Sequence, residues 1–212
     1  MKLQLALDVF SLNDALVLTG KVKDYIDIIE IGTPFLLEEG MSAVRQFRSN
    51  FPDKKIFADT KIMDAGELEA ASAIQAGADY VTVLAVTDIA TVEACVSTAN
   101  KYGKEIIADM ICVDDIPAKV RQLEAAGVHG IAVHTGVDQQ KMGRTPLDDL
   151  KVIKEHCKNA DIYVAGGISL KTVLSYAEHK PDVLIVGGAV GSAANPVEEA
   201  KNIRMELDSY SR

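Results

Sequence analysis

Residues 67–84 of the chain read ELEAASAIQAGADYVTVL. The first ten have the apolar spacing of a helix, and Gly77 follows where a helix commonly ends in a left-handed conformation. Residues 80–84 are rich in β-branched side chains, which is typical of a buried strand. A buried strand that directly follows a helix indicates a parallel βαβ arrangement.

This unit recurs along the chain. A second helix is expected at 117–126, ended by Gly127. Short apolar runs that predict strands lie at residues 3–7, 26–31, 55–58, 80–85, 105–110, 130–134, 162–165 and 183–186. Eight near-equal units predict a single (β/α)8 TIM barrel over residues 1–212. An open doubly wound sheet is the alternative, but no G-x-G-x-x-G motif follows the first run, which favours the barrel.

Composition excludes several classes of protein. The formal net charge is −9 and no Lys/Arg-rich run occurs, which argues against nucleic-acid binding and against attachment to an anionic membrane. No segment has the roughly 20 apolar residues that a membrane span needs, and the N-terminus lacks a signal-peptide core. Three cysteines outside any motif predict free thiols and a cytoplasmic protein.

Ionisable side chains follow or end the predicted strands. Because active sites of such barrels lie at the C-terminal ends of the strands, we expect these side chains to share one rim. They are Asp8, Glu30, Asp59, Lys61, Asp109 and His134. Any one of them alone could be an ordinary structural polar residue, but six at one rim predict a functional site.

Residues 59–64 form the pattern D-x-K-x-x-D, which places Lys61 between Asp59 and Asp64. Alternation along an extended chain predicts that Asp59 and Lys61 point the same way. Flanking carboxylates should hold the pKa of Lys61 up, which argues for an electrostatic role and against an amine nucleophile. The alternative is a solvated turn after a strand.

Two carboxylates on adjacent strands, Glu30 and Asp59, predict a Mg²⁺ site completed by water and substrate oxygens. The alternative is that Glu30 merely pairs with Lys61. His134 is the histidine at a strand end and is therefore the expected proton carrier.

Glycine pairs close the last two predicted strands, at 166–167 and 187–188. Barrels commonly hold a phosphate there through backbone N–H groups, although tight turns also require glycine. A metal, a lysine, a proton carrier and a phosphate site together suit an enediolate formed next to the carbonyl of a sugar phosphate. Aldol bond formation, protonation after decarboxylation and epimerisation all remain open from that intermediate.

Five segments carry a resemblance to a known family. They are DIIEIGTP at 27–34, FADTKIMDAGELEA at 57–70, AGADYVTVL at 76–84, VAGGI at 164–168 and VGGAV at 186–190. The chain resembles the orotidine monophosphate decarboxylase superfamily over its whole length and, within it, the 3-hexulose-6-phosphate synthase family. That resemblance implies Mg²⁺-dependent condensation of formaldehyde with ribulose 5-phosphate, and the reverse cleavage.

The resemblance also implies roles for individual residues. Glu30 and Asp59 would serve the metal, and His134 would handle the proton at the enediolate carbon. It further implies a homodimer in which Asp64 reaches the partner's site. The residues expected to line the substrate are Asp8, Lys61 and Asp109, and those expected at the phosphate are Gly167, Gly187 and Gly188.

A sister family, 3-keto-L-gulonate-6-phosphate decarboxylase (KGPDC), shares most of these residues. It has a glutamate where this chain has Asp109, and arginines where this chain has Val137 and Gly188. All three departures favour the synthase over the decarboxylase. A non-catalytic phosphosugar-binding protein is the alternative from another class, and it would need the glycine turns without an ordered acid–lysine–acid element.

Overall fold

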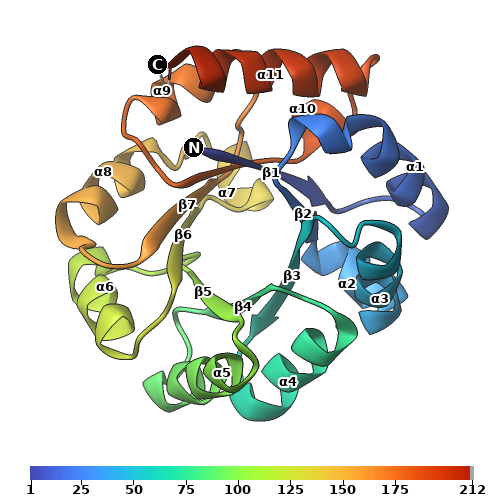
Figure 1. Cartoon of the computed structure of the whole chain (residues 1–212). Helices are drawn as coiled ribbons and strands as arrows, with labels where there is room; N and C mark the ends of the chain where they lie inside the picture. Colours follow the sequence, from blue (N-terminus) through green and yellow to red (C-terminus); the bar gives the residue numbers. More distant parts are fainter. Residues whose placement is uncertain (211–212) are drawn as a thin grey trace.

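The computed structural model describes residues 1–210, which form a ring of helices around a barrel of strands (Figure 1). The strands are β1 Lys2–Leu7, β2 Ile28–Ile31, β3 Lys55–Ile62, β4 Tyr80–Leu84, β5 Glu105–Asp109, β6 Gly130–His134, β7 Asp161–Ala165 and β8 Val183–Val186. The larger helices are α1 Leu12–Val22, α3 Met41–Asn50, α4 Gly66–Ala76, α5 Ile89–Tyr102, α6 Ile116–Ala125, α8 Leu147–His156 and α11 Pro196–Tyr210. Shorter turns of helix are η1 Lys23–Tyr25, α2 Thr33–Glu39, α7 Val137–Lys141, α9 Val173–Ala177 and α10 Gly188–Gly191.

The eight strands form a closed parallel barrel in sequence order, with β1 paired to both β2 and β8. The predicted (β/α)8 barrel is therefore confirmed. Two predicted strands, β2 and β3, differ from the observed ones by more than one residue at one end. β2 starts at Ile28 because Ile26 and Asp27 form the connection that follows the short helix η1, and β3 continues to Ile62 through the D-x-K pattern.

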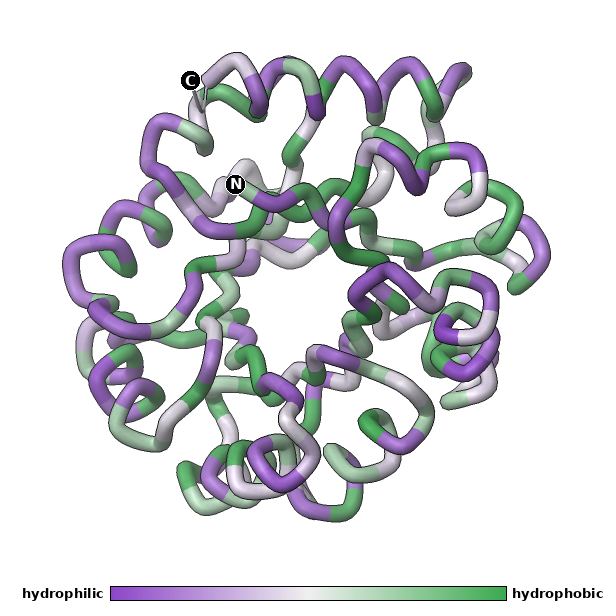
Figure 2. The backbone as a smooth tube through the Cα atoms, viewed as in Figure 1, coloured by the Kyte–Doolittle hydropathy of each residue, from purple (hydrophilic) through white to green (hydrophobic). Residues whose placement is uncertain are grey.

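The strands are apolar because both of their faces are buried. Outward-facing side chains such as Leu5, Ile29 and Val81 pack against the helices. The helices alternate hydrophilic and hydrophobic residues along their length, as Figure 2 shows, so each has an apolar side for that layer.

A second, smaller core fills the barrel itself. Its members are Ile28, Phe57, Tyr80, Ile107, Ala132, Tyr163, Val183 and Ile185. Two residues further along β2, β3, β4, β5 and β6, the inward positions carry Glu30, Asp59, Thr82, Asp109 and His134. The barrel interior is thus polar toward the C-terminal ends of the strands and apolar in the layer that precedes them along the strands.

The predicted helix end at Gly77 is confirmed. Gly77 is the C-cap of α4 with φ +114°, and its N–H donates to the carbonyl of Ile74. None of the helices within residues 1–210 is long and apolar enough to cross a membrane.

Candidate functional site

A cavity of about 940 Å³ opens at the C-terminal ends of the strands. All six ionisable rim residues predicted from the sequence line it, as do the three glycines predicted to bind phosphate. They are Asp8, Glu30, Asp59, Lys61, Asp109, His134, Gly167, Gly187 and Gly188. The barrel thus brings together residues that lie up to 180 positions apart, from Asp8 to Gly188.

Asp59 is almost fully buried and is held from three sides. Its carboxylate accepts hydrogen bonds from Thr33 Oγ1 at 2.8 Å and from Thr82 Oγ1 at 2.9 Å. Lys61 Nζ contacts both carboxylate oxygens, at 2.8 and 3.0 Å. Asp59 and Lys61 therefore meet, but the regular strand alternation that the sequence suggested is interrupted, because Lys61 has a left-handed φ of +48°.

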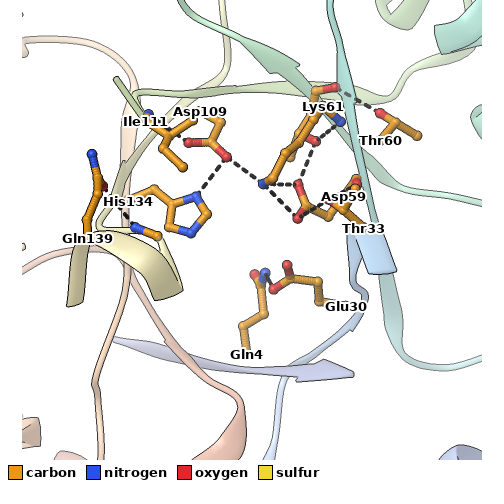
Figure 3. Close-up of polar contacts among 12 residues, drawn as sticks. Gln4, Glu30, Thr33, Asp59, Thr60, Lys61, Asp109, Ile111, His134 and Gln139 are labelled. Atoms are coloured by element: carbon orange, nitrogen blue, oxygen red, sulfur yellow. Dashed lines mark hydrogen bonds and ion pairs between the residues drawn. The ribbon is translucent and has the colours of Figure 1, made fainter. Parts of the chain in front are cut away.

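Lys61 Nζ also donates to Asp109 Oδ2 at 2.7 Å, so the ammonium bridges two carboxylates from β3 and β5 (Figure 3). Burial opposes the charged form, but Asp59 and Asp109 outweigh it and raise the pKa of Lys61 above its usual range. The side chain is accordingly a permanent cation at neutral pH, suited to stabilising negative charge.

Asp109 joins the lysine to the histidine. The same Oδ2 atom lies 2.9 Å from His134 Nδ1, and Oδ1 accepts from the backbone N–H of Ile111 at 2.9 Å. Burial favours the neutral acid, but His134 and Lys61 overcome it and lower the pKa of Asp109 to about 2. Because Nδ1 is engaged, Nε2 is the ring nitrogen of His134 left to exchange a proton with a bound molecule.

The pKa of Glu30 shifts in the opposite direction to that of Asp109. Burial and the charge of nearby Asp59 raise its pKa to about 8, although a 2.6 Å hydrogen bond from Gln4 Nε2 favours the carboxylate. Within residues 1–210, no ion pair joins Glu30 to Lys61, so the suggested Glu30–Lys61 pairing is not formed. Burial and Asp59 also raise the pKa of Asp8, at the mouth of the cavity.

The residues around Glu30 fit a hard divalent cation. A buried carboxylate without a cationic partner is costly, and Gln4 Oε1 beside it is buried without a hydrogen-bond partner in the described chain. Over the same residues, no group of three or more His, Cys, Asp or Glu side chains forms a metal cage. Two carboxylates, with water and substrate oxygens completing the shell, match how proteins usually hold Mg²⁺.

The glycine turns that follow β7 and β8 line the same cavity. Gly166 and Gly167 have φ of +121° and +67°, and Gly188 is the first residue of α10. A Cβ atom added at Gly188 would meet no atom within 4 Å, so a side chain can start at that position without a clash at its Cβ.

Asp64 is the predicted site residue that does not line the cavity. It is exposed in the loop between β3 and α4, and its Oδ1 accepts from the backbone N–H of Ala65 at 2.7 Å. The acid–lysine–acid pattern therefore does not form one cluster within this chain.

Sequence reasoning missed three polar residues that hold the site: Gln4, Thr33 and Thr82. Gln4 and Thr82 are nevertheless visible as single polar residues inside the apolar strands KLQLAL and YVTVL. Both are buried on the inward face, where an uncompensated polar group would be costly, so such residues indicate a partner inside the barrel.

Residues 1–203 match the model of the orotidine 5′-phosphate decarboxylase / HUMPS family. The chain is 42% identical over 212 residues to 3-hexulose-6-phosphate synthase 2 of Staphylococcus saprophyticus, covering 100% of both chains. It is also similar to the crystal structure of 3-hexulose-6-phosphate synthase from Salmonella typhimurium, with 51% identity, a TM-score of 0.97 and 99% and 100% of the two chains covered. A crystal structure of KGPDC from Streptococcus mutans is more distant, at 30% identity and a TM-score of 0.91 over 99% and 98% of the chains.

Proposed function

The chain belongs to the orotidine 5′-phosphate decarboxylase / HUMPS family, and on that premise we propose that it is a 3-hexulose-6-phosphate synthase-like aldolase, an aldehyde-lyase. It would condense formaldehyde with ribulose 5-phosphate and catalyse the reverse cleavage. The observation that carries this proposal is the chain of contacts from Asp59 through Lys61 and Asp109 to His134, next to the buried Glu30. Full-length similarity to named synthases supports the choice of substrates.

Glu30 and Asp59 would hold Mg²⁺. The bound ion would act as a Lewis acid that makes the carbon next to the ketone of the sugar phosphate more acidic. Asp8 would bind substrate hydroxyls at the mouth of the cavity, and the backbone at Gly167, Gly187 and Gly188 would bind the phosphate.

Different side chains would transfer the proton and stabilise the negative charge. His134 Nε2 would remove the proton from the carbon that becomes the nucleophile, while Asp109 holds the ring through Nδ1. Lys61 would stabilise the oxyanion of the resulting enediolate. That carbon would then attack the carbonyl carbon of formaldehyde, and the new alkoxide would take up the proton that His134 had removed, which gives the hexulose phosphate and restores the neutral histidine.

We also propose a homodimer in which Asp64 reaches the neighbouring subunit's site. Asp64 is exposed outside its own cavity, and Met63 and Leu68, which are near it in the sequence, expose 53% and 73% of their surface. Exposed apolar side chains around a charged site residue support a contact surface there. A cytoplasmic location is likewise a proposal, supported by the free thiols of Cys95, Cys112 and Cys157.

One paired assay tests the reaction. Ribulose 5-phosphate, formaldehyde and Mg²⁺ are incubated with the protein, with and without EDTA, beside a decarboxylation assay with 3-keto-L-gulonate 6-phosphate. We expect EDTA-sensitive consumption of formaldehyde that exceeds decarboxylation. A faster decarboxylation would assign the chain to the sister reaction, and binding of the sugar phosphate without turnover in either assay would indicate a sensor.

A further inference from the structure

The β3–β4 pairing contains an irregularity opposite one residue. Ala58 pairs with Val81, and the next paired residues are Ile62 and Val83. Three residues of β3, at positions 59–61, therefore lie opposite the single residue Thr82. Such a bulge bends the strand and redirects its side chains, and here it includes the left-handed backbone of Lys61, at φ +48°.

Thr82 bonds to each of these three bulge residues. Its hydroxyl donates to Asp59 Oδ1 at 2.9 Å and accepts from the backbone N–H of Lys61 at 2.8 Å. Its carbonyl accepts from Thr60 Oγ1 at 2.8 Å. Thr82 is 2% exposed, so water has little access to compete for these bonds.

The hydroxyl is used in a defined direction. A threonine hydroxyl has one hydrogen, which Thr82 donates in its hydrogen bond to the Asp59 carboxylate. A lone pair on the hydroxyl oxygen then accepts the hydrogen bond from the Lys61 N–H. The other hydroxyl on the same carboxylate, from Thr33, bonds to Asp59 alone. The Thr82 side chain thus links the Asp59 carboxylate to the Lys61 backbone.

We propose that Thr82 is a positioning residue for the proposed reaction, on which this inference rests. By joining the Asp59 carboxylate to the Lys61 N–H, it holds the bulge that aims the Lys61 ammonium between Asp59 and Asp109. Removing the hydroxyl would take away the partner of the Lys61 backbone N–H and would leave Asp59 Oδ1 with the hydrogen bond from Lys61 Nζ but without the one from Thr82. Reacting groups displaced by about 1 Å can lose on the order of 100-fold in rate, so loss of this anchor should lower kcat.

The test compares Thr82→Val, which keeps the size and removes the hydroxyl, with Thr82→Ser, which keeps the hydroxyl. Thr98→Val is the matched control, because Thr98 is also 2% exposed and its hydroxyl has no partner within residues 1–210. Thr82→Ala is a second hydroxyl-free variant should the valine form not fold. Thermal melts verify folding, and three quantities are then measured: hydrogen exchange of the Lys61 amide, Mg²⁺ affinity by calorimetry, and kcat and KM.

Thr82→Val should lose protection of the Lys61 amide, bind Mg²⁺ about 10-fold more weakly and lower kcat about 10- to 100-fold with little change in KM. Thr82→Ser and Thr98→Val should match the wild type in all three. The proposal would be overturned if Thr82→Val kept the wild-type exchange rate of the Lys61 amide and the wild-type kcat. It would also be overturned if the only change in Thr82→Val were a lower melting temperature. A wild type without turnover would instead refute the proposed function, and amide exchange and Mg²⁺ affinity would still decide the role of Thr82.

Discussion

Gln4 Nε2 donates a 2.6 Å hydrogen bond to the Glu30 carboxylate inside the barrel. Gln4 is the only side-chain donor to this carboxylate among residues 1–210, and Glu30 lies on the strand next to it in the barrel. A neutral amide does not compensate a buried negative charge, which is why the pKa of Glu30 is still raised. Glu30 thus has a defined orientation but forms no ion pair with any side chain of residues 1–210.

The first prediction concerns stability without metal. The folded-state pKa of Glu30 is raised from 4.5 to about 8, so between these values the folded protein binds more protons than the unfolded chain. Its free energy of unfolding in EDTA should therefore fall as pH rises through this window. Glu30→Gln stays uncharged and should be about 1–3 kcal/mol more stable than wild type at pH 8 but not at pH 5.

Thermal melts in EDTA at several pH values measure this difference. Glu38→Gln, at an exposed position on α2, serves as the control and should follow the wild type. An equal stability gap at pH 5 and pH 8 would show that Glu30 carries no raised pKa.

The second prediction concerns the orientation of Glu30. Gln4→Met has nearly the same length but donates no hydrogen bond, so the Glu30 carboxylate loses its anchor. Loss of a partner of this kind typically weakens metal binding about 10- to 100-fold, and we expect the low end of that range here. Calorimetric titration with Mg²⁺ is the measurement, and unchanged affinity in the folded variant would contradict it.

The third prediction concerns Asp59. Asp59→Ala should remove a metal ligand and one of the two anions that hold Lys61, lowering Mg²⁺-dependent kcat by about 100-fold or more. Steady-state rates across a Mg²⁺ series would measure it. Full activity in this variant would contradict the assignment of Asp59 as a Mg²⁺ ligand.

The fourth prediction tests shared sites. Asp64→Ala and Lys61→Ala should each reduce activity, and mixed dimers of the two should regain part of it because one intact site can form. Differently tagged chains allow the heterodimer to be purified and assayed against each homodimer. No recovery in a verified heterodimer would remove the cross-subunit role of Asp64.

The fifth prediction concerns specificity. Val137 lines the cavity at the start of α7 and is 69% exposed, so an arginine can replace it without repacking the core. Val137→Arg should raise decarboxylation of 3-keto-L-gulonate 6-phosphate relative to aldol synthesis, since a cation near the enediolate can guide its protonation. The ratio of the two rates is the readout, and a ratio equal to that of wild type would show that position 137 does not select the reaction.

The barrel and most of its rim could be predicted because they depend on local patterns. Apolar runs separated by helical segments indicated eight strands, and parallel strands bring their C-terminal ends to one edge. Asp8, Glu30, Asp59, Lys61, Asp109 and His134 therefore met as expected. The prediction was incomplete at Gln4, Thr33 and Thr82, because what these residues bond to depends on strand pairing.

By itself, then, the sequence determined the strand order and which ionisable groups share the cavity, since residue spacing and alternation are properties of the chain alone. Only the tertiary structure decided that β3 bulges opposite Thr82 and that Asp64 stays outside the cavity. It also decided the opposite pKa shifts of two buried carboxylates, to about 8 for Glu30 and about 2 for Asp109. The reason is that a bulge, the burial of a side chain and the charges next to it all depend on contacts between strands that are distant in sequence. Asp109 is contacted by Lys61 and His134, whereas Glu30 is contacted by the neutral amide of Gln4.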